Sequence, residues 1–326
     1  MMAMATTASS EEHTASYGVV QLARSLHANL QQVVLGAPEA VTVAVVAALS
    51  GGHLLLEDVP GVGKTVLART LAHSLGAQLS RVQGHPDLLP TDVTGVSVYS
   101  PEDRSWEFRP GPVFAPVVLA DELNRTPPRT QSALLEAMEE HQVSVDGNCW
   151  PLPRPHFVVA TQNPVSQRGT YPLVESQLDR FALATTIGYP DAEQESRIVR
   201  HHGGRYALGD IEAVTGPDGW RRAQEATETV AVTEVVADYA VALCRATRHA
   251  PGVELGASPR AAIWLIRAAQ ARAVLAGRDF VAPSDVKDMA VPCLAHRLVL
   301  TDEAAGLASA ANLVSSVVAA TAAPRP

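Results

Sequence analysis

The feature that most constrains this chain is a glycine-rich loop between an expected strand and an expected helix. Residues 53–56 form a short, mainly apolar run, and residues 64–75 follow a helical pattern. Gly61 and Gly63 between them let the backbone fold closely enough to point several N–H groups at phosphate oxygens. The start of the helix adds the positive end of its dipole. The pattern therefore predicts a site for the phosphates of a nucleotide.

Two side chains of this loop have expected roles. Lys64 would reach the β- and γ-phosphates, and the Thr65 hydroxyl would hold Mg²⁺. Asp58 stands where the pattern GxxxxGK[ST] has its first glycine. Only two of the 25 basic residues are lysines, Lys64 and Lys287, so chance is a poor explanation for a lysine here. The predicted phosphate-binding residues are Pro60, Gly61, Val62, Gly63, Lys64, Thr65 and Val66.

A second apolar run, residues 117–120, ends at two acids. We expect Asp121 to belong to the Mg²⁺ shell and Glu122 to polarise the attacking water. A solvent-facing acidic pair is the alternative, but the same predicted sheet carries the phosphate loop. The sequence thus predicts a site for a nucleotide and Mg²⁺.

A third apolar run, residues 157–160, leads into Thr161, Gln162 and Asn163. A polar side chain at the end of a strand beside the Asp121 strand can hydrogen-bond both the water and the γ-phosphate. Asn163 is our first candidate and Gln162 its competitor. The Asn-Pro pair taken alone is also typical of a turn.

The order of elements predicts an α/β core with a doubly wound parallel sheet, followed by a small all-helical domain. Helical patterns at 17–35, 38–49, 64–75 and 130–140 alternate with the apolar runs, and hairpins are expected at about 95–110 and 142–152. From residue 191 onward helical patterns dominate. We therefore expect a flexible tail at 1–16, a core at 17–190, a helical domain at 191–320 and a tail at 321–326.

Composition excludes several classes of protein. A net charge of −9 weighs against sequence-independent binding of nucleic acid. Cys149, Cys244 and Cys293 form no CxxC pair, which argues against a zinc module or disulfide scaffold and fits a cytoplasmic location. The first residues lack the pattern of a secretory signal. The uncharged run 304–323 is rich in alanine and serine, so we expect a packing helix and no membrane span.

Taken together, these segments resemble the MoxR family of AAA+ ATPases over about residues 34–300. The matching stretches are 55–65, 108–114, 119–131, 160–164, 169–173, 179–181 and 257–260. The chain departs from the family at Val174-Glu175-Ser176, where Pro-Glu-Ala is common, and after Leu300 the pattern is degenerate.

The resemblance implies roles for individual residues. Lys64 and Thr65 match the Walker A motif, and Asp121 and Glu122 match Walker B. Asn163 matches sensor 1, Arg180 the arginine finger that enters a neighbouring subunit's site, and Arg260 the sensor 2 arginine of the lid. Val34, Leu35 and Gly36 fall where related ATPases seat the adenine. The two hairpins correspond to insertions that face the pore of the ring.

The resemblance also implies a homo-hexameric ring that acts as a chaperone-like motor. Such rings often work with a von Willebrand factor A domain protein on maturation or metal insertion of a client. Each nucleotide would lie between core and lid of one subunit and be completed by Arg180 of the next. Two alternatives are a nucleotide-gated scaffold with little hydrolysis and a DNA-linked ring ATPase, which the net charge disfavours.

Overall fold

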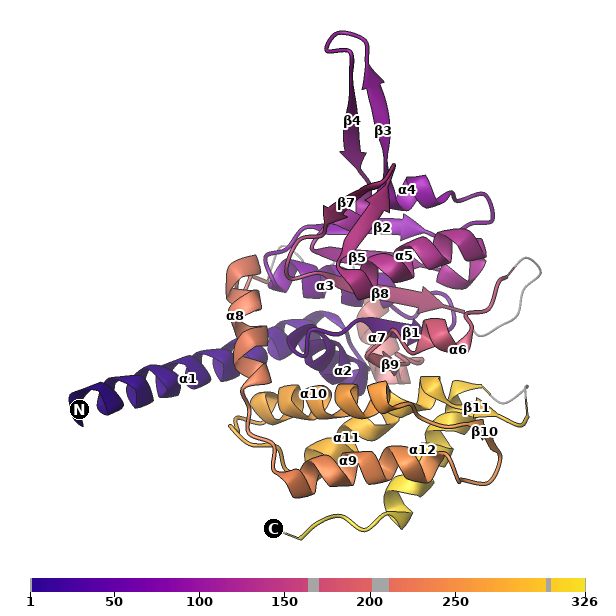
Figure 1. Ribbon diagram of the computed structural model, residues 1–326. Coiled ribbons are helices and arrows are strands. Elements are labelled where there is room, and N and C mark those ends of the chain that lie inside the picture. Colours follow the sequence, from indigo (N-terminus) through magenta and orange to yellow (C-terminus); the bar gives the residue numbers. More distant parts are fainter. Residues whose placement is uncertain (1, 164–169, 201–210, 303–305, 326) are drawn as a thin grey trace.

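The computed structural model describes residues 2–163, 170–200, 211–302 and 306–325 (Figure 1). Its central sheet has five parallel strands in the order β2-β5-β8-β1-β9. These strands are β1 (Leu54–Glu57), β2 (Leu79–Gln83), β5 (Val117–Asp121), β8 (Phe157–Gln162) and β9 (Leu183–Thr185). The three central strands are those that the apolar runs predict, whereas the edge strands β2 and β9 were not predicted.

Both faces of the sheet are buried under helices. Successive side chains of a strand point to opposite faces, so Leu54 and Leu56 pack with α2 (Pro38–Leu49) and α3 (Lys64–Ser74). Leu55, between them, packs in a second apolar cluster with α5 (Pro128–Glu140). The prediction of an α/β core with helices on both faces is confirmed.

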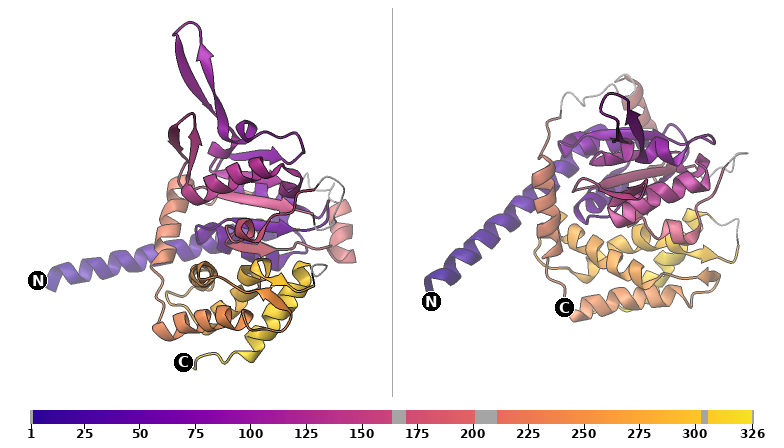
Figure 2. Two further views of the ribbon diagram at one scale, coloured as in Figure 1. Left: turned by 45° about the vertical axis from the view of Figure 1, so that its right-hand side comes forward. Right: turned by 45° about the horizontal axis from the view of Figure 1, so that its top comes forward.

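Two hairpins leave the core where the sequence predicts them. The first consists of β3 (Gly95–Ser100) and β4 (Ser105–Pro110), next to the short helix α4 (Pro90–Thr94), and it projects far from the sheet (Figures 1 and 2). The second consists of β6 (Gln142–Val145) and β7 (Asn148–Pro151). Asp146 and Gly147 turn it with φ angles of 52° and 77°, as in a two-residue hairpin loop.

The first helix is longer than the periodicity predicts. We expected a flexible tail at 1–16 and a helix from Tyr17, but α1 spans Met2–Val33. Its C-terminal half packs against α2, α3, α8 and α10, while its N-terminal end extends away from the body (Figure 2). Residues 2–16 are largely polar and lack the apolar periodicity of a packed helix, so the prediction missed this part of α1.

Helices dominate after residue 190, as predicted. They are α7 (Ala192–Arg200), α8 (Pro217–Glu228), α9 (Glu234–Thr247), α10 (Pro259–Leu275), α11 (Pro283–Leu294) and α12 (Leu307–Ala320). The short helix α6 (Glu175–Leu178) precedes β9. One short antiparallel pair accompanies the helices, formed by β10 (Val253–Leu255) and β11 (Val299–Leu300). Strands of two or three residues carry too little periodicity to be seen in the sequence.

Helix α8 belongs to the core by its contacts, although it falls in the segment 191–320. Trp220 of α8 is fully buried, its Nε1–H donates to the Ala48 carbonyl at 2.9 Å, and its ring meets Phe157 of β8 at 6.3 Å. Helices α9 to α12 form the lid that lies beneath the sheet in Figure 1. We call these four helices, with β10 and β11, the lid.

Helix α12 accounts for most of the uncharged run near the C-terminus. Its Ala310, Val314 and Val317 pack into the core cluster, so it is a packing helix, as predicted. Among the described residues, no helix combines the length and hydropathy needed to cross a membrane.

The buried position of Trp220 yields a stability prediction. Trp220→Ala should lower the free energy of unfolding by about 3–5 kcal/mol, because it opens a cavity between α8 and β8. Trp106 at the first hairpin is 71% exposed, so Trp106→Ala should change stability by no more than about 0.5 kcal/mol. Urea titration followed by circular dichroism measures both, and equal losses would contradict the assignment of α8 to the core.

Candidate functional site

The phosphate loop has the backbone that its sequence predicts. It joins the end of β1 to the start of α3, and Gly61 and Gly63 have φ angles of 90° and 104°. L residues other than glycine rarely adopt such angles. A Cβ built on either glycine would meet no described atom within 4 Å, so the loop borders open space. A cradle of this shape fits the phosphates of a nucleotide.

Lys64 lies in the loop with its amine on two backbone oxygens. Its Nζ donates to the carbonyls of Asp58 at 2.5 Å and Val59 at 3.2 Å. Burial lowers the pKa of Lys64, and the charges of Asp58, Asp121 and Glu122 oppose that shift. Lys64 is thus within electrostatic reach of both predicted Walker B acids.

A buried threonine joins the two acids. Asp121 ends β5, and its Oδ1 accepts a hydrogen bond from Thr161 Oγ1 at 2.7 Å. The same Oγ1 accepts from the Glu122 N–H at 2.8 Å. Thr161 is fully buried in β8, the strand beside β5. The bridge fixes Asp121 and the backbone of Glu122, whose φ of 56° turns the chain out of the strand.

The Glu122 carboxylate is engaged by two donors. Arg125 Nη1 donates to its Oε2 at 2.9 Å, and Gln83 Nε2 donates to the same oxygen at 3.2 Å. Both of these hydrogen bonds end on Oε2, so they do not involve the second carboxylate oxygen, Oε1.

Arg81 of β2 is the second partner of Asp121. Its Nη2 lies 2.7 Å from Asp121 Oδ2, and the same nitrogen donates to Gln83 Oε1. Thr65 and Asp121 supply the hydroxyl and carboxylate oxygens that Mg²⁺ prefers. The donor set fits the ion, and a cation bound at Asp121 Oδ2 would compete with Arg81.

The end of β8 separates the two candidates for the sensing residue. Gln162 Nε2 donates to Glu57 Oε2 at 2.5 Å, so its amide is directed at β1. Burial raises the pKa of the Glu57 carboxyl, against the hydrogen bonds from Gln162 and the Leu307 backbone. The Asn163 carbonyl accepts from Asn124 Nδ2 at 3.1 Å. Gln162 is thus engaged with Glu57, and the choice of Asn163 as the sensing residue stays a prediction. Pro164 and Gly169 of the matching stretches lie outside the described residues.

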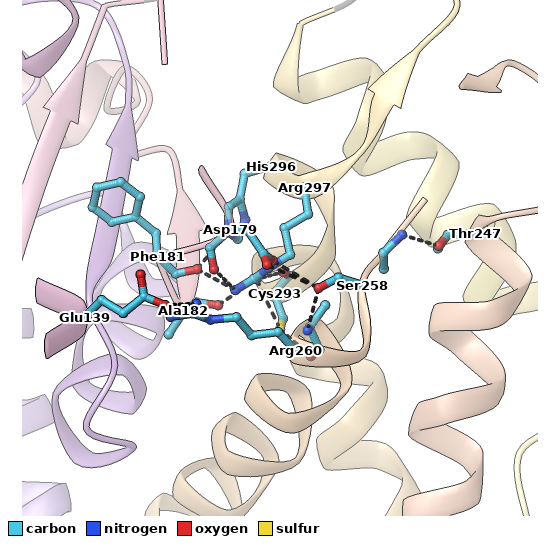
Figure 3. Close-up of polar contacts among 12 residues, drawn as sticks. Glu139, Asp179, Phe181, Ala182, Thr247, Ser258, Arg260, Cys293, His296 and Arg297 are labelled. Carbon is cyan, nitrogen blue, oxygen red and sulfur yellow. Dashed lines mark hydrogen bonds and ion pairs between the residues drawn. The ribbon is translucent and has the colours of Figure 1, made fainter. Parts of the chain in front are cut away.

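Arg180 and Arg260 share one carboxylate. Arg180 Nε lies 3.1 Å from Glu139 Oε2. Arg260 Nη1 lies 2.5 Å from Glu139 Oε1 (Figure 3). The hydrogen bond from Arg260 lowers the pKa of Glu139 despite partial burial, and the charges of both arginines add to that effect. The structure therefore brings the predicted finger and the predicted sensor 2 arginine together.

This pair lies at the sheet edge opposite the phosphate loop. His53, just before β1, accepts from the Val158 N–H at its Nδ1 and donates from Nε2 to the Met138 carbonyl. Burial lowers the pKa of His53 to about 3, so the ring stays neutral. Glu139 follows Met138 and so lies where β1 begins, whereas the loop lies where β1 ends. Arg260 is not brought to the phosphate loop of its own chain.

The lid is joined to the core at that same edge. Arg297 is 5% exposed and donates to Asp179 Oδ1 at 2.8 Å and to the Phe181 carbonyl at 2.6 Å (Figure 3). His296 donates to the same carbonyl at 3.1 Å, and burial lowers its pKa well below the usual value. Ser258 caps α10 and donates to Asp179 at 3.3 Å. Asp179, which precedes the predicted finger, is thus a joint between core and lid.

The predicted adenine seat lies beside the segment that leaves the core. Val34 is buried in the apolar core, while Gly36 has a φ of 82° and lies against Pro190. We call residues 186–190, between β9 and α7, the connector. A cavity of about 760 Å³ begins at Pro38 and Glu39 and extends to Thr185 and to α12, but none of residues 34–36 lines it. The adenine position stays a prediction.

Sequence reasoning missed four side chains of this site. Arg81 and Gln83 lie on β2, an edge strand whose mixed polar sequence is not typical of a buried strand. Thr161 lies at the end of a predicted strand, but only its neighbours Gln162 and Asn163 were predicted to have a role. Glu139 carried no signal, because its partners are distant in the sequence.

Known proteins resemble the chain over most of its length. Residues 53–183 match the ATPase family associated with various cellular activities (AAA), and residues 245–316 match the AAA lid domain. The uncharacterized protein YeaC of Bacillus subtilis is 46% identical over 276 residues, which cover 85% of this chain and 86% of YeaC. Chaperone MoxR1 of Mycobacterium tuberculosis is 40% identical over 288 residues, which cover 84% of this chain and 75% of MoxR1.

A solved structure agrees with the fold. The crystal structure of a Cytophaga hutchinsonii protein superimposes with a TM-score of 0.86 at 34% identity and covers 98% of both chains. Lys64, Asp121, Asn163 and Arg180 fall within the segment that matches the AAA family, and Arg260 falls within the segment that matches the lid.

The threonine bridge can be tested with a matched pair of variants. Thr161→Val removes the hydroxyl between Asp121 and Glu122 and should cost about 1–3 kcal/mol of stability. Thr247 of the lid is also fully buried and also both donates and accepts, so Thr247→Val should cost a similar amount. Only Thr161→Val should also slow ATP turnover, measured by phosphate release at a temperature where both variants are folded. Equal turnover in the two variants would show that the bridge is structural only.

Proposed function

Because this chain belongs to the MoxR family of AAA+ ATPases, we propose that it hydrolyses ATP with Mg²⁺ and uses the energy to remodel a partner protein. One observation carries the proposal. Lys64 of the glycine-rich loop is close enough to feel the charges of Asp121 and Glu122, which stand at the end of a nearby strand of the same sheet. Phosphoryl transfer needs this combination of a phosphate cradle, a metal-binding acid and a base.

The chain's own residues would perform separate tasks. Thr65 and Asp121 would hold Mg²⁺, which neutralises charge on the phosphates. Lys64 would exchange the Asp58 and Val59 carbonyls for phosphate oxygens. Glu122 would accept a proton from the attacking water at its carboxylate, one oxygen of which is held by Arg125 and Gln83. Asn163, at the end of β8, would orient that water. Val34, Leu35 and Gly36, beside the connector, would border the adenine.

The two arginines support a site shared between subunits. Arg180 and Arg260 lie at the amino edge of the sheet, away from their own phosphate loop. We propose that both enter the site of a neighbouring subunit and stabilise charge that develops on the phosphates. Glu139 would hold them until the neighbour binds nucleotide. The sequence resemblance extends this to a homo-hexamer that works with a von Willebrand factor A domain protein on an unknown client.

The roles of lysine and glutamate can be separated. Lys64→Ala should abolish nucleotide binding, measured by titration with a fluorescent ATP analogue, because the phosphates lose their cation. Glu122→Gln should bind normally, yet lose about 10²–10⁴-fold in turnover. Lys287→Ala, which removes the chain's other lysine from an exposed lid position, is the matched control. If Lys64→Ala and Glu122→Gln lost binding equally, the assignment of roles would fail.

The shared site can be tested by mixing variants. Arg180→Ala should bind ATP but lose about 10³-fold or more in turnover, the scale of an arginine finger. Mixed with Lys64→Ala protein, it should regain part of that activity, because an intact loop then meets an intact finger. Arg221→Ala, at an exposed ion pair on α8, is the control and should keep full turnover. A mixture no more active than its components argues against a site shared between subunits.

A further inference from the structure

The residue that replaces the first glycine of the phosphate loop is bound to the connector. Asp58 is 7% exposed, and its Oδ2 accepts hydrogen bonds from the N–H groups of Ile187 and Gly188, both at 2.7 Å. Its Oδ1 accepts from the Val59 N–H at 2.8 Å. A glycine at this position has no side chain to make these contacts. The loop of this chain is therefore tied to the segment that leaves the core.

The connector leads from β9 towards α7, and Asp58 holds two of its backbone N–H groups. Gly188 has a φ of 75°, which bends the backbone, and Ile187 packs against the apolar core. Hydrogen bonds from N–H groups to an ionised carboxylate are stronger than those to a neutral acceptor. Two successive N–H groups on one oxygen fix the direction in which the chain departs from β9.

Asp58 also contacts Lys64, through its backbone carbonyl. The peptide unit between Asp58 and Val59 receives Lys64 Nζ on its oxygen, while its N–H donates to Asp58 Oδ1. The Asp58 N–H is fixed to the Gln162 carbonyl of β8 at 3.1 Å. If bound phosphates draw Lys64 away, the carbonyl of this peptide unit loses its hydrogen-bond donor. The N–H of the same peptide unit is bonded to the Asp58 carboxylate, which holds the connector.

We propose that Asp58 is a positioning residue that transmits the filling of the phosphate loop to the connector. The inference rests on the proposed function, since it assumes that Lys64 moves to a bound nucleotide. Asp58 faces away from the phosphates, toward three N–H donors that compensate its charge. It therefore acts through the backbone of Ile187 and Gly188 and touches no substrate.

Backbone amide exchange tests the proposal directly. Hydrogen–deuterium exchange with mass spectrometry, using overlapping peptides across 183–190, reports on the Ile187 and Gly188 N–H groups. In the full wild-type chain, adding the ATP analogue AMP-PNP with Mg²⁺ should change their exchange rates several-fold. In Asp58→Gly and Asp58→Asn, exchange without nucleotide should be about tenfold faster or more, and AMP-PNP should no longer change it. AMP-PNP affinity should stay within about threefold.

A control and a second variant separate coupling from loss of stability. Asp285 is a buried carboxylate in the lid that accepts from the Ala282 N–H and from Arg278, so Asp285→Asn should destabilise the chain but keep the nucleotide response at 183–190. Asp58→Asn preserves the side-chain shape if Asp58→Gly fails to fold, and a wild-type connector that does not respond overturns the proposal without any variant.

The outcomes distinguish the two claims. If wild-type protein binds AMP-PNP and its connector amides do not respond, Asp58 has no coupling role and the proposed ATPase stands. If the Asp58 variants keep the wild-type response, the coupling runs through other contacts and the inference is wrong. If wild-type protein binds no nucleotide, the proposed function fails and the inference fails with it.

Discussion

The shared direction of five parallel strands is the constraint on which the site depends. Because β1, β5 and β8 run the same way, their carboxyl ends meet at one edge and bring Lys64, Asp121 and Asn163 into one region. Ligands of open α/β sheets bind at this edge for the same reason. The amino ends meet at the opposite edge, where Glu139 holds the two arginines. The common direction of the strands thus separates the groups proposed to act on the chain's own nucleotide from the two arginines proposed to act on a neighbour's.

Four of the groups with proposed roles are engaged with protein partners in this structure. Lys64 is on carbonyls, Asp121 on Arg81, Glu122 on Arg125, and Arg180 on Glu139. The ion pairs involve arginines that are 29–47% exposed, and pairs of this kind contribute about 0–1 kcal/mol each. A nucleotide bound at micromolar affinity supplies about 8 kcal/mol. These contacts are therefore strong enough to define a resting arrangement and weak enough for a nucleotide to replace.

The sequence predicted the centre of the sheet and the residues at its carboxyl edge, because buried strands are apolar and the phosphate loop requires particular residues. The edge strand β2 was not predicted, because its polar residues Ser80, Arg81 and Gln83 interrupt the apolar pattern that is typical of a buried strand. The contact of Glu139 with Arg180 and Arg260 joins residues far apart in the chain, which no local pattern encodes. Asp58 was visible as a departure from the loop pattern, but its partners Ile187 and Gly188 follow the unpredicted strand β9.

The two edges also differ in how firmly they hold the lid. At the amino edge, the buried Arg297 donates to Asp179 and to the carbonyls of Phe181 and Ala182, and buried hydrogen bonds of a charged group contribute about 1.5–3 kcal/mol each. At the carboxyl edge, next to the phosphate loop, the half-buried Glu57 accepts a hydrogen bond from the backbone of Leu307 in α12. The firm joint is thus the one farther from the phosphate loop. We therefore expect an adjustment that follows nucleotide binding to fall first at the carboxyl edge, where Asp58 holds the connector.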